Sequence, residues 1–571
     1  MSVTSAATRS AAATADKPGT ASKSRPMRRT IRPSNEPCLP PPPDLGLPKH
    51  FPAWRPGQSE IIAALGESQH RASVLALPTG SGKTLAYMGA AKFLDYGRAA
   101  ILTSTRGLQD QIESEFIGLN SDIADIRGMA NYPCVVLADR SRLQVTNPRH
   151  FPAHLGCDRG PCRGGEDCTL RAAGCHYFDQ QKIARSQKSV LTNYAYWLAI
   201  HEHSPVEDPL GKFDCLIMDE AHEIPDEVCR YLGTEITIEK CREYGLPLWP
   251  WGSDSIQKWA AWGRDCETTL KDETGDPDEV RRQREMMLRI GRFTSAGVVP
   301  DRWVVECVDD WKTKEPSHVA LHPIWPAPYM ESRLFRHIPK LIFSSATIIP
   351  KTMSVIGLEP DEYDFLELPS PFPVENRLVT HVPTQRVDAR TPTRAAWFRR
   401  IDQIVGARLD RKGIIHAVSY ARAKEIKYQS MYSDRMIVPN SQTTRQEVEA
   451  FKRSKEPLVL VSPAVTTGYD FPGKACEYQI ICKIPFPDTR SAVMKARQKT
   501  DKEYGTFIAA VRIVQAVGRG VRFLLDSCET FIIDDHWQWF KKKAWKFFPT
   551  PFRNSVRRAD ILPRPPAPLS E

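Results

Sequence analysis

The chain has 571 residues, of which 41% are hydrophobic and 26% are charged, and its formal net charge is +10. A chain of this length is too long for one hydrophobic core, so we expect two or three domains. It contains no apolar run long enough to cross a bilayer and no apolar centre of a secretory signal, which excludes a membrane-spanning or secreted protein and predicts a cytoplasmic one, or a nuclear one in a eukaryote.

Both ends of the chain are predicted to be disordered. Residues 1–46 are rich in Ala, Ser, Thr, Pro and basic side chains, with too little apolar surface to offset the entropy of ordering. Such a basic arm is also typical of a mitochondrial transit peptide, although Pro18, Gly19 and Pro26 interrupt any amphipathic helix. Residues 551–571 are predicted to form a second tail.

A strand, a glycine-rich turn and a helix follow one another near residue 80. The apolar residues 74–77 predict the strand, and glycines in the turn let backbone N–H groups face phosphate oxygens at the N-terminus of the helix. Lys83 is placed to hold the β- and γ-phosphates of a nucleotide, and the Thr84 hydroxyl to bind Mg²⁺. We expect the whole turn to bind nucleotide: Thr79, Gly80, Ser81, Gly82, Lys83 and Thr84.

Five of the 14 cysteines lie in one short span: Cys134, Cys157, Cys162, Cys168 and Cys175. Disulfides are disfavoured in a reduced compartment. Structural zinc usually draws on close cysteine pairs, whereas these spacings are irregular. A [4Fe–4S] cluster needs four thiolates and would leave one spare, and a metal-free remnant is a further alternative. The residues alone leave these alternatives open.

A second buried strand is predicted at residues 215–218, with two carboxylates directly after it. Open α/β sheets collect their ligands at this end of their strands. Asp219 is therefore expected to bind Mg²⁺, and Glu220 to orient and deprotonate the attacking water.

Residues 229–328 are too many to connect consecutive strands of one sheet, so we expect an insertion. Its polar, charged stretches predict helices, and core packing is favoured over base stacking for its tryptophans. These are Trp249, Trp251, Trp259, Trp262, Trp303 and Trp311.

A second α/β domain is predicted after residue 350. Apolar runs predict its strands at residues 413–418, 458–462, 478–483 and 530–535. Arg519 and Arg522 lie three residues apart, so on a helix they share one face, although alone they are also typical of a solvated basic surface. In residues 537–548 the aromatic side chains fall on one helical stripe and the lysines mostly off it, which favours core packing over a nucleic-acid platform.

Several segments together resemble superfamily 2 helicases, and the cysteines resemble those of the XPD/DinG-like iron–sulfur branch, which place one after Asn-Tyr and one before an aromatic pair. The segments are "WRPGQ" (54–58), "PTGSGKT" (78–84), "TSTRGLQDQ" (103–111), "NYPC" (131–134), "CHYF" (175–178), "DEAH" (219–222), "FSSATI" (343–348), "SPAVTTGYDFPG" (462–473) and "QAVGRGVRF" (515–523).

The resemblance implies ATP and Mg²⁺ as cofactors and Arg519 and Arg522 as fingers on the γ-phosphate. It implies that Gln58, with Arg55, reads the adenine, and that residues 103–111 contact the nucleic-acid backbone. It adds three residues to the nucleotide site: Gly468, Asp470 and Gln515. One departure is Tyr194, where the family often has histidine.

For the cysteines, the resemblance implies a [4Fe–4S] cluster with Cys134 and Cys175 as the outer ligands. Cys162 and Cys168 are then the middle pair, and Cys157 is the alternative ligand. The segment would form part of the pore through which one strand passes.

The implied fold is α/β: two RecA-like parallel-sheet domains, with a cysteine-rich insertion and a shortened Arch-like helical insertion in the first. The expected boundaries are a basic arm at 1–46; the first RecA-like domain at 47–130, 180–228 and 329–350; the Fe–S domain at 131–179; the Arch-like insertion at 229–328; the second RecA-like domain at 351–550; and a tail at 551–571.

The implied function is an ATP-dependent DNA helicase, a monomer that tracks on single-stranded DNA and unwinds duplex DNA. The 5′ to 3′ direction rests on the resemblance alone. One alternative is an RNA-dependent ATPase, because DEAH is shared with RNA remodellers. Another is a recruited subunit that acts through protein partners bound by its tails and insertion.

Overall fold

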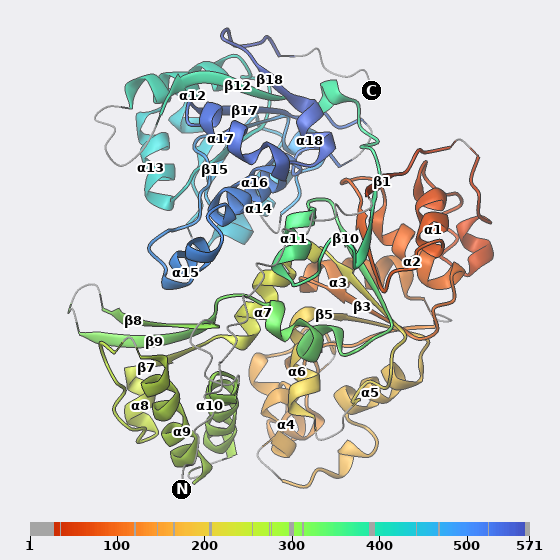
Figure 1. Cartoon of the computed structure of the whole chain (residues 1–571), viewed down its shortest axis with the longest axis vertical. Coiled ribbons are helices and arrows are strands. Elements are labelled where there is room, and N and C mark those ends of the chain that lie inside the picture. Colours follow the sequence, from red (N-terminus) through yellow and green to blue (C-terminus); the bar gives the residue numbers. More distant parts are fainter. Residues whose placement is uncertain are drawn as a thin grey trace, which may run out of the picture.

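The structure is a computed structural model, which contains two parallel sheets, a cysteine-rich segment and an insertion with a small sheet of its own (Figure 1). Within the described residues, no helix is long and apolar enough to span a membrane. The structure describes residues 28–34, 36–118, 122–145, 147–163, 166–204, 208–253, 255–272, 275, 277–295, 302–310, 313, 315–386, 394–440, 442–465, 469–522 and 525–565.

The first sheet has eight parallel strands. Helices cover both of its faces, so its central strands are almost completely buried. Its order is β1 (Arg28–Thr30), β11 (Tyr363–Glu367), β2 (Ala72–Ala76), β10 (Lys340–Ser345), β6 (Cys215–Asp219), β3 (Ala99–Thr103), β5 (Ser189–Asn193) and β4 (Ile123–Asp125). On one face pack α1 (Gln58–Gly66), α2 (Lys83–Phe93) and α3 (Arg106–Phe116), and on the other α6 (Tyr194–His203) and α7 (Ile224–Leu232).

The register of strand β10 aligns three of the predicted motifs. Ser345 pairs with Ala76 of β2, and Ser344 pairs with Asp219 of β6. The ends of these parallel strands therefore lie at one edge of the sheet, where the P-loop, the two carboxylates and "FSSATI" meet.

The second sheet has seven parallel strands, also covered by helices. Its order is β14 (Met436–Ile437), β15 (Val459–Ser462), β13 (Gly413–His416), β16 (Tyr478–Ile481), β17 (Glu529–Asp534), β12 (Val379–Gln385) and β18 (Val556–Arg558). Its helices are α12 (Ala395–Gly406), α13 (Tyr420–Gln429), α14 (Thr444–Arg453), α15 (Ala492–Thr500), α16 (Tyr504–Val517), α17 (Trp537–Ala544) and α18 (Thr550–Ser555). The two RecA-like parallel-sheet domains predicted from the sequence are present.

The structure differs from the predicted boundaries in three places. Strand β1 lies in the predicted basic arm and pairs in parallel with β11, and Arg28 also forms an ion pair of 2.7 Å with Glu367; residues 1–27 lie outside the described residues. Strand β11 belongs to the first sheet although it follows residue 350. Strand β18 adds an edge to the second sheet from within the predicted tail. Short edge strands carry too little periodicity to be read from sequence.

The cysteine-rich segment contains little regular structure. Helices α4 (Val135–Arg140) and α5 (His176–Ser186) bracket four short 3₁₀ turns. The insertion contains α8 (Ile238–Glu243), α9 (Ile256–Lys271) and α10 (Pro277–Ser295), and an antiparallel sheet that the helical prediction missed: β7 (Thr234–Thr237), β9 (Pro316–Pro323) and β8 (Trp303–Asp309). The two regions meet where a turn at Pro161–Arg163 packs on α10.

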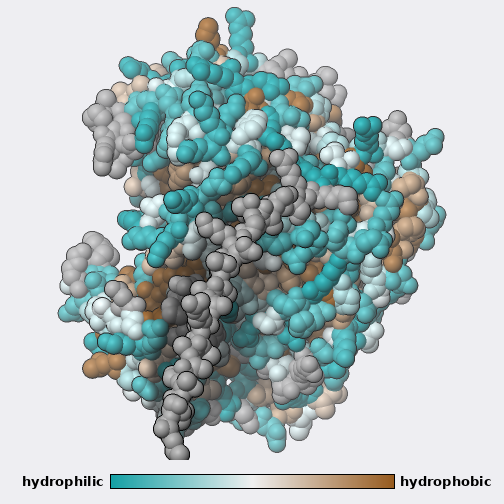
Figure 2. All heavy atoms as spheres, in the orientation of Figure 1, coloured by the Kyte–Doolittle hydropathy of each residue, from teal (hydrophilic) through white to brown (hydrophobic). Residues whose placement is uncertain are grey.

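The core-packing predictions hold for most of the aromatic residues concerned. Trp259, Trp262 and Trp303 are buried in the insertion, whereas Trp251 is 37% exposed and Trp311 lies outside the described residues. Trp537, Phe540 and Phe548 are buried in the second domain. The face of the molecule in Figure 2 is mostly hydrophilic, with some hydrophobic side chains near the place where the insertion meets the second domain.

Candidate active site

The turn after β2 has the backbone of a phosphate cradle. Gly80 and Gly82 adopt φ of 76° and 72°, the left-handed region that favours glycine. A Cβ on Gly82 would lie 2.3 Å from Gln58 Nε2, and one on Gly80 would lie 2.1 Å from the Phe372 ring. Helix α2 begins directly at Lys83, so its unpaired N–H groups face the place where phosphates would bind.

Gln58 is buried beneath this turn and supports it. Its Nε2 donates to the Ser81 and Gly82 carbonyls, each at 2.9 Å, and its Oε1 accepts from the Arg55 backbone N–H at 2.7 Å. Arg55 in turn donates to the Gly80 carbonyl at 2.8 Å. The amide of Gln58 is therefore occupied by the P-loop in this structure, and its reading of adenine stays a prediction.

The two carboxylates after β6 lie opposite the cradle. Glu220 has φ of 47°, a strained turn that directs its side chain to Lys83, with Oε1 3.1 Å from Nζ. Tyr87 donates to Asp219 Oδ2 at 3.3 Å, while Asp219 Oδ1 is buried and makes no hydrogen bond. An orphaned carboxylate oxygen beside Thr84 fits an Mg²⁺ ligand.

Burial and nearby charges shift the pKa values of the two carboxylates in opposite directions. Burial, and then the charge of Glu220, raise the pKa of Asp219 to about 6. Burial also opposes ionisation of Glu220, but Lys83 and His222 outweigh it and hold the pKa of Glu220 well below its usual value. Glu220 is therefore ionised at neutral pH, as a base that accepts a proton from water must be.

His222 connects the two motor domains. Its Nδ1 lies 2.8 Å from Ser345 Oγ at the end of β10, and its Nε2 lies 2.6 Å from Gln515 Nε2 on α16 of the second domain. The sequence reasoning named Gln515 but not His222. The available signal was its place in "DEAH", since a polar side chain in the turn after a strand at the ligand edge is a candidate contact.

The two arginines face the same space from the second domain. Arg519 Nη1 lies 3.1 Å from Asp470 Oδ1, and Arg522 also forms an ion pair with Asp470. Their side chains are 16% and 23% exposed. Asp470 therefore holds both groups beside the cavity, while Gly468 lies outside the described residues.

One cavity of about 1000 Å³ contains almost all the predicted nucleotide-site residues. Among the predicted residues that the structure describes, Ser81 is the exception, because its hydroxyl turns away to donate to the Pro78 carbonyl. Phe372, on the connection between the domains, is a lining residue that the sequence reasoning missed. From the first domain the lining contains Arg55, Gln58, Thr79, Gly80, Gly82, Lys83, Thr84, Asp219 and Glu220, and from the second Asp470, Gln515, Arg519 and Arg522.

All five cysteines of the cysteine-rich segment line one small apolar cavity. Cys134 and Cys157 are held side by side, because the Cys134 N–H donates to the Leu155 carbonyl at 2.7 Å and the Cys157 N–H to the Tyr132 carbonyl at 2.8 Å. Among the described residues, no three His, Cys, Asp or Glu side chains already stand around a metal position. The donor set fits a thiolate-bound cluster, but the geometry does not single out four of the five.

Comparisons with known proteins agree with this architecture. Residues 52–244 match the family described as type III restriction enzyme, res subunit, and residues 411–555 match the helicase C-terminal domain. The chain is 20% identical to the ATP-dependent DNA helicase YoaA of Escherichia coli over 86% of this chain and 93% of that protein. It is 25% identical to YoaA of Haemophilus influenzae over 35% of this chain and 38% of that protein.

Solved structures share the fold at low sequence identity. A structure titled "XPD_Helicase" has a TM-score of 0.54 and 14% identity, covering 88% of this chain and 99% of the other. "XPD_APO" has a TM-score of 0.53 and 13% identity with the same coverage. Together these matches support an XPD/DinG-like superfamily 2 helicase. It is an ATP-hydrolysing enzyme.

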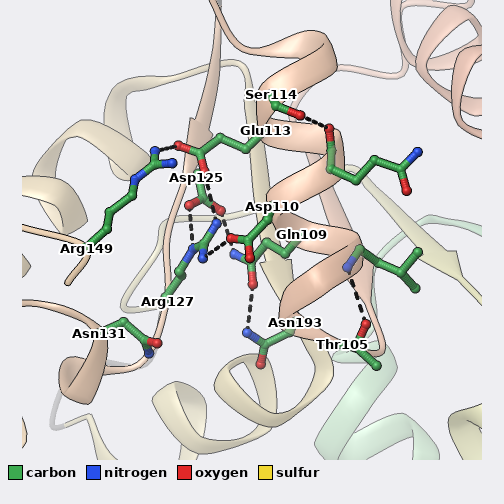
Figure 3. A network of polar contacts seen from close by, with 12 residues as sticks. Thr105, Gln109, Asp110, Glu113, Ser114, Asp125, Arg127, Asn131, Arg149 and Asn193 are labelled. Atoms are coloured by element: carbon green, nitrogen blue, oxygen red, sulfur yellow. Dashed lines mark hydrogen bonds and ion pairs between the residues drawn. The ribbon is translucent and has the colours of Figure 1, made fainter. Parts of the chain in front are cut away.

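In this XPD/DinG-like helicase, helix α3 of the first domain is tied to the root of the cysteine-rich segment by an ion-pair cluster (Figure 3). Arg127 contacts Asp125 at 2.7 Å and Glu113 at 3.0 Å, and also pairs with Asp110. Its backbone N–H donates to Tyr132 Oη at 3.1 Å, two residues before Cys134. Sequence reasoning missed Arg127, because Glu113 and Asp110 lie 14 and 17 residues before it, on a separate helix.

Proposed function

We propose that this helicase tracks along single-stranded DNA from 5′ to 3′ and separates the strands of a duplex. The observation that carries the proposal is the single cavity with Lys83, Asp219 and Glu220 on one wall and Arg519 and Arg522 on the other. Hydrolysis in such a cavity changes the attraction between its walls, and so drives relative movement of the two domains. DNA is the substrate class in the printed names of both YoaA relatives.

The chain's own groups have distinct roles in hydrolysis. Lys83 and the N–H groups of the cradle bind the β- and γ-phosphates of ATP, and Glu220 orients the attacking water and accepts its proton. Arg519 and Arg522 leave Asp470 for the γ-phosphate and stabilise the charge of the transition state. Thr84 and Asp219 would hold Mg²⁺, which neutralises charge between the phosphate oxygens.

The cysteine cavity supports a [4Fe–4S] cluster. We assign Cys134, Cys162, Cys168 and Cys175 as its ligands, with Cys157 as the alternative. The cluster would cross-link residues 131–179, which have too small a hydrophobic core to fold alone. We assign residues 229–328 as the Arch-like insertion, and propose that it binds protein partners.

Strand displacement tests the proposal, with 5′-tailed and 3′-tailed duplexes and iron measured on the same preparation. We expect displacement of the 5′-tailed duplex only, with about four iron atoms per chain. Displacement of neither duplex, with ATP turnover stimulated equally by any polyanion, would overturn it, and stoichiometric zinc would overturn the cluster. Stronger stimulation by RNA than by DNA of equal length would favour the RNA-dependent ATPase.

A further inference from the structure

Helix α15 of the second domain docks on strand β8 of the insertion (Figure 1), and none of its residues lines the ATP cavity. The insertion lies between two strands of the first domain. This contact is therefore a second junction between the first domain and the second. Its contacts include the Ala492 N–H, which donates to Glu306 Oε2 of β8 at 3.2 Å, and the Trp325 and Tyr504 rings, which pack edge-on at 5.0 Å.

Arg497 lies at the centre of this junction and is 6% exposed. Its Nε donates to the Ile324 carbonyl at 2.6 Å and its Nη2 to Cys229 Sγ at 3.3 Å, so it binds both ends of the insertion. Its Nη1 donates to Tyr504 Oη of its own domain at 2.8 Å. One side chain therefore joins α7, the end of β9 and helix α16.

The groups around Arg497 give the junction a defined geometry but little net stabilisation. The only carboxylate paired with Arg497 in the described residues is Asp226, at 3.9 Å and 67% exposed. The guanidinium is thus surrounded mainly by neutral groups, and its desolvation offsets much of the gain from its hydrogen bonds. The fixed directions of the guanidinium hydrogen bonds nevertheless determine the orientation of α15 on the insertion.

We propose that Arg497 is a positioning residue that transmits movement of the second domain to the insertion during the ATP cycle. The expected effect on strand separation rests on the proposed function, because the movement can separate strands only if the insertion contacts the nucleic acid. Arg497 lies outside the ATP cavity, so its removal separates ATP hydrolysis from strand separation.

Hydrogen exchange on the full chain tests the transmission without requiring helicase activity. On addition of a non-hydrolysable ATP analogue, we expect changed exchange in residues 315–325 of the wild-type protein. The Arg497→Met variant should lose that response and keep the response of the P-loop. Arg490→Met is the matched control, because Arg490 is in the preceding segment, is 90% exposed and, among the described residues, pairs with its neighbour Asp488 alone. An unchanged response in Arg497→Met would overturn the proposal.

The consequence is measured as duplex displaced per ATP hydrolysed. For Arg497→Met we expect a fall of about tenfold, with ATP turnover within about twofold of wild type. Arg497→Lys keeps the positive charge but not the directed hydrogen bonds of the guanidinium, and should give intermediate results in both assays. If the Met variant does not fold, the result for Arg497→Lys tests the proposal in its place. If the wild type displaces no duplex while the exchange responses differ as expected, the proposed function fails and the transmission stands.

Discussion

The ATP cavity and the cysteine cavity are built in opposite ways. The ATP cavity takes its residues from strand ends of the first domain and from helix α16 and nearby loops of the second, with Lys83 and Arg519 more than 400 residues apart in the chain. The cysteine cavity takes all its thiols from one span. The first therefore depends on how two stable domains meet, whereas the second depends on whether one short segment can fold.

This difference predicts that changes in the two cavities have separate effects. Changes in the ATP cavity should reduce turnover while the folded state survives, because each sheet has its own buried core. Changes in the cysteine cavity should reduce metal content and local stability while basal turnover survives. The four experiments below test this from the largest expected effect to the smallest.

Lys83→Ala should lower the kcat of ATP hydrolysis about 10³-fold, because it removes the ammonium that we propose holds the β- and γ-phosphates. The melting temperature should change little. The control is Lys92→Ala on the same helix, whose lysine pairs with Asp122 on the surface. Turnover unaffected by Lys83→Ala would contradict the assigned site and favour the recruited-subunit alternative.

Arg519→Ala should lower kcat about 10²-fold with a small change in KM, because Arg522 remains beside the γ-phosphate and shares the charge. Steady-state kinetics measure both constants. Arg512→Ala on α16 is the control, since its guanidinium donates to the Pro485 carbonyl. A matching loss in the control would indicate a general defect of the second domain.

The double variant Cys134→Ser, Cys175→Ser should reduce iron from about four atoms per chain to less than about one. It should also raise hydrogen exchange in residues 131–179 while ATP turnover without DNA stays within about twofold. Cys307→Ser, at a half-buried thiol of the insertion, should change none of these. Full iron retention in the double variant would remove Cys134 and Cys175 from the ligand set.

Gln58→Ala should raise the KM for ATP about tenfold and leave kcat within about twofold, because the Ser81 and Gly82 carbonyls lose their buried donor and the cradle loosens. Gln69→Ala, near the far end of helix α1, serves as the control. A lower kcat with unchanged KM would place Gln58 in the chemical step instead.

Much of the ATP site was predictable because each part has a local signature. The glycines at 80 and 82, with Lys83 after them, identify a phosphate cradle, and Asp219 and Glu220 follow a strand at the ligand edge of a sheet. His222, Phe372 and Arg127 were missed because their roles depend on partners in other parts of the structure: Gln515, Gly80 and the carboxylates of α3.

By itself, the sequence determined the class of chemistry and the alternation of strands and helices, since glycine turns, strand-end carboxylates and hydrophobic periodicity are properties of neighbouring residues. Only the tertiary structure decided which residues face one another. It placed Arg519 and Arg522 opposite Lys83, added β11 to the first sheet, and docked Arg497 on the insertion. The physical reason is that such contacts follow from the packing of whole domains, which no local pattern encodes.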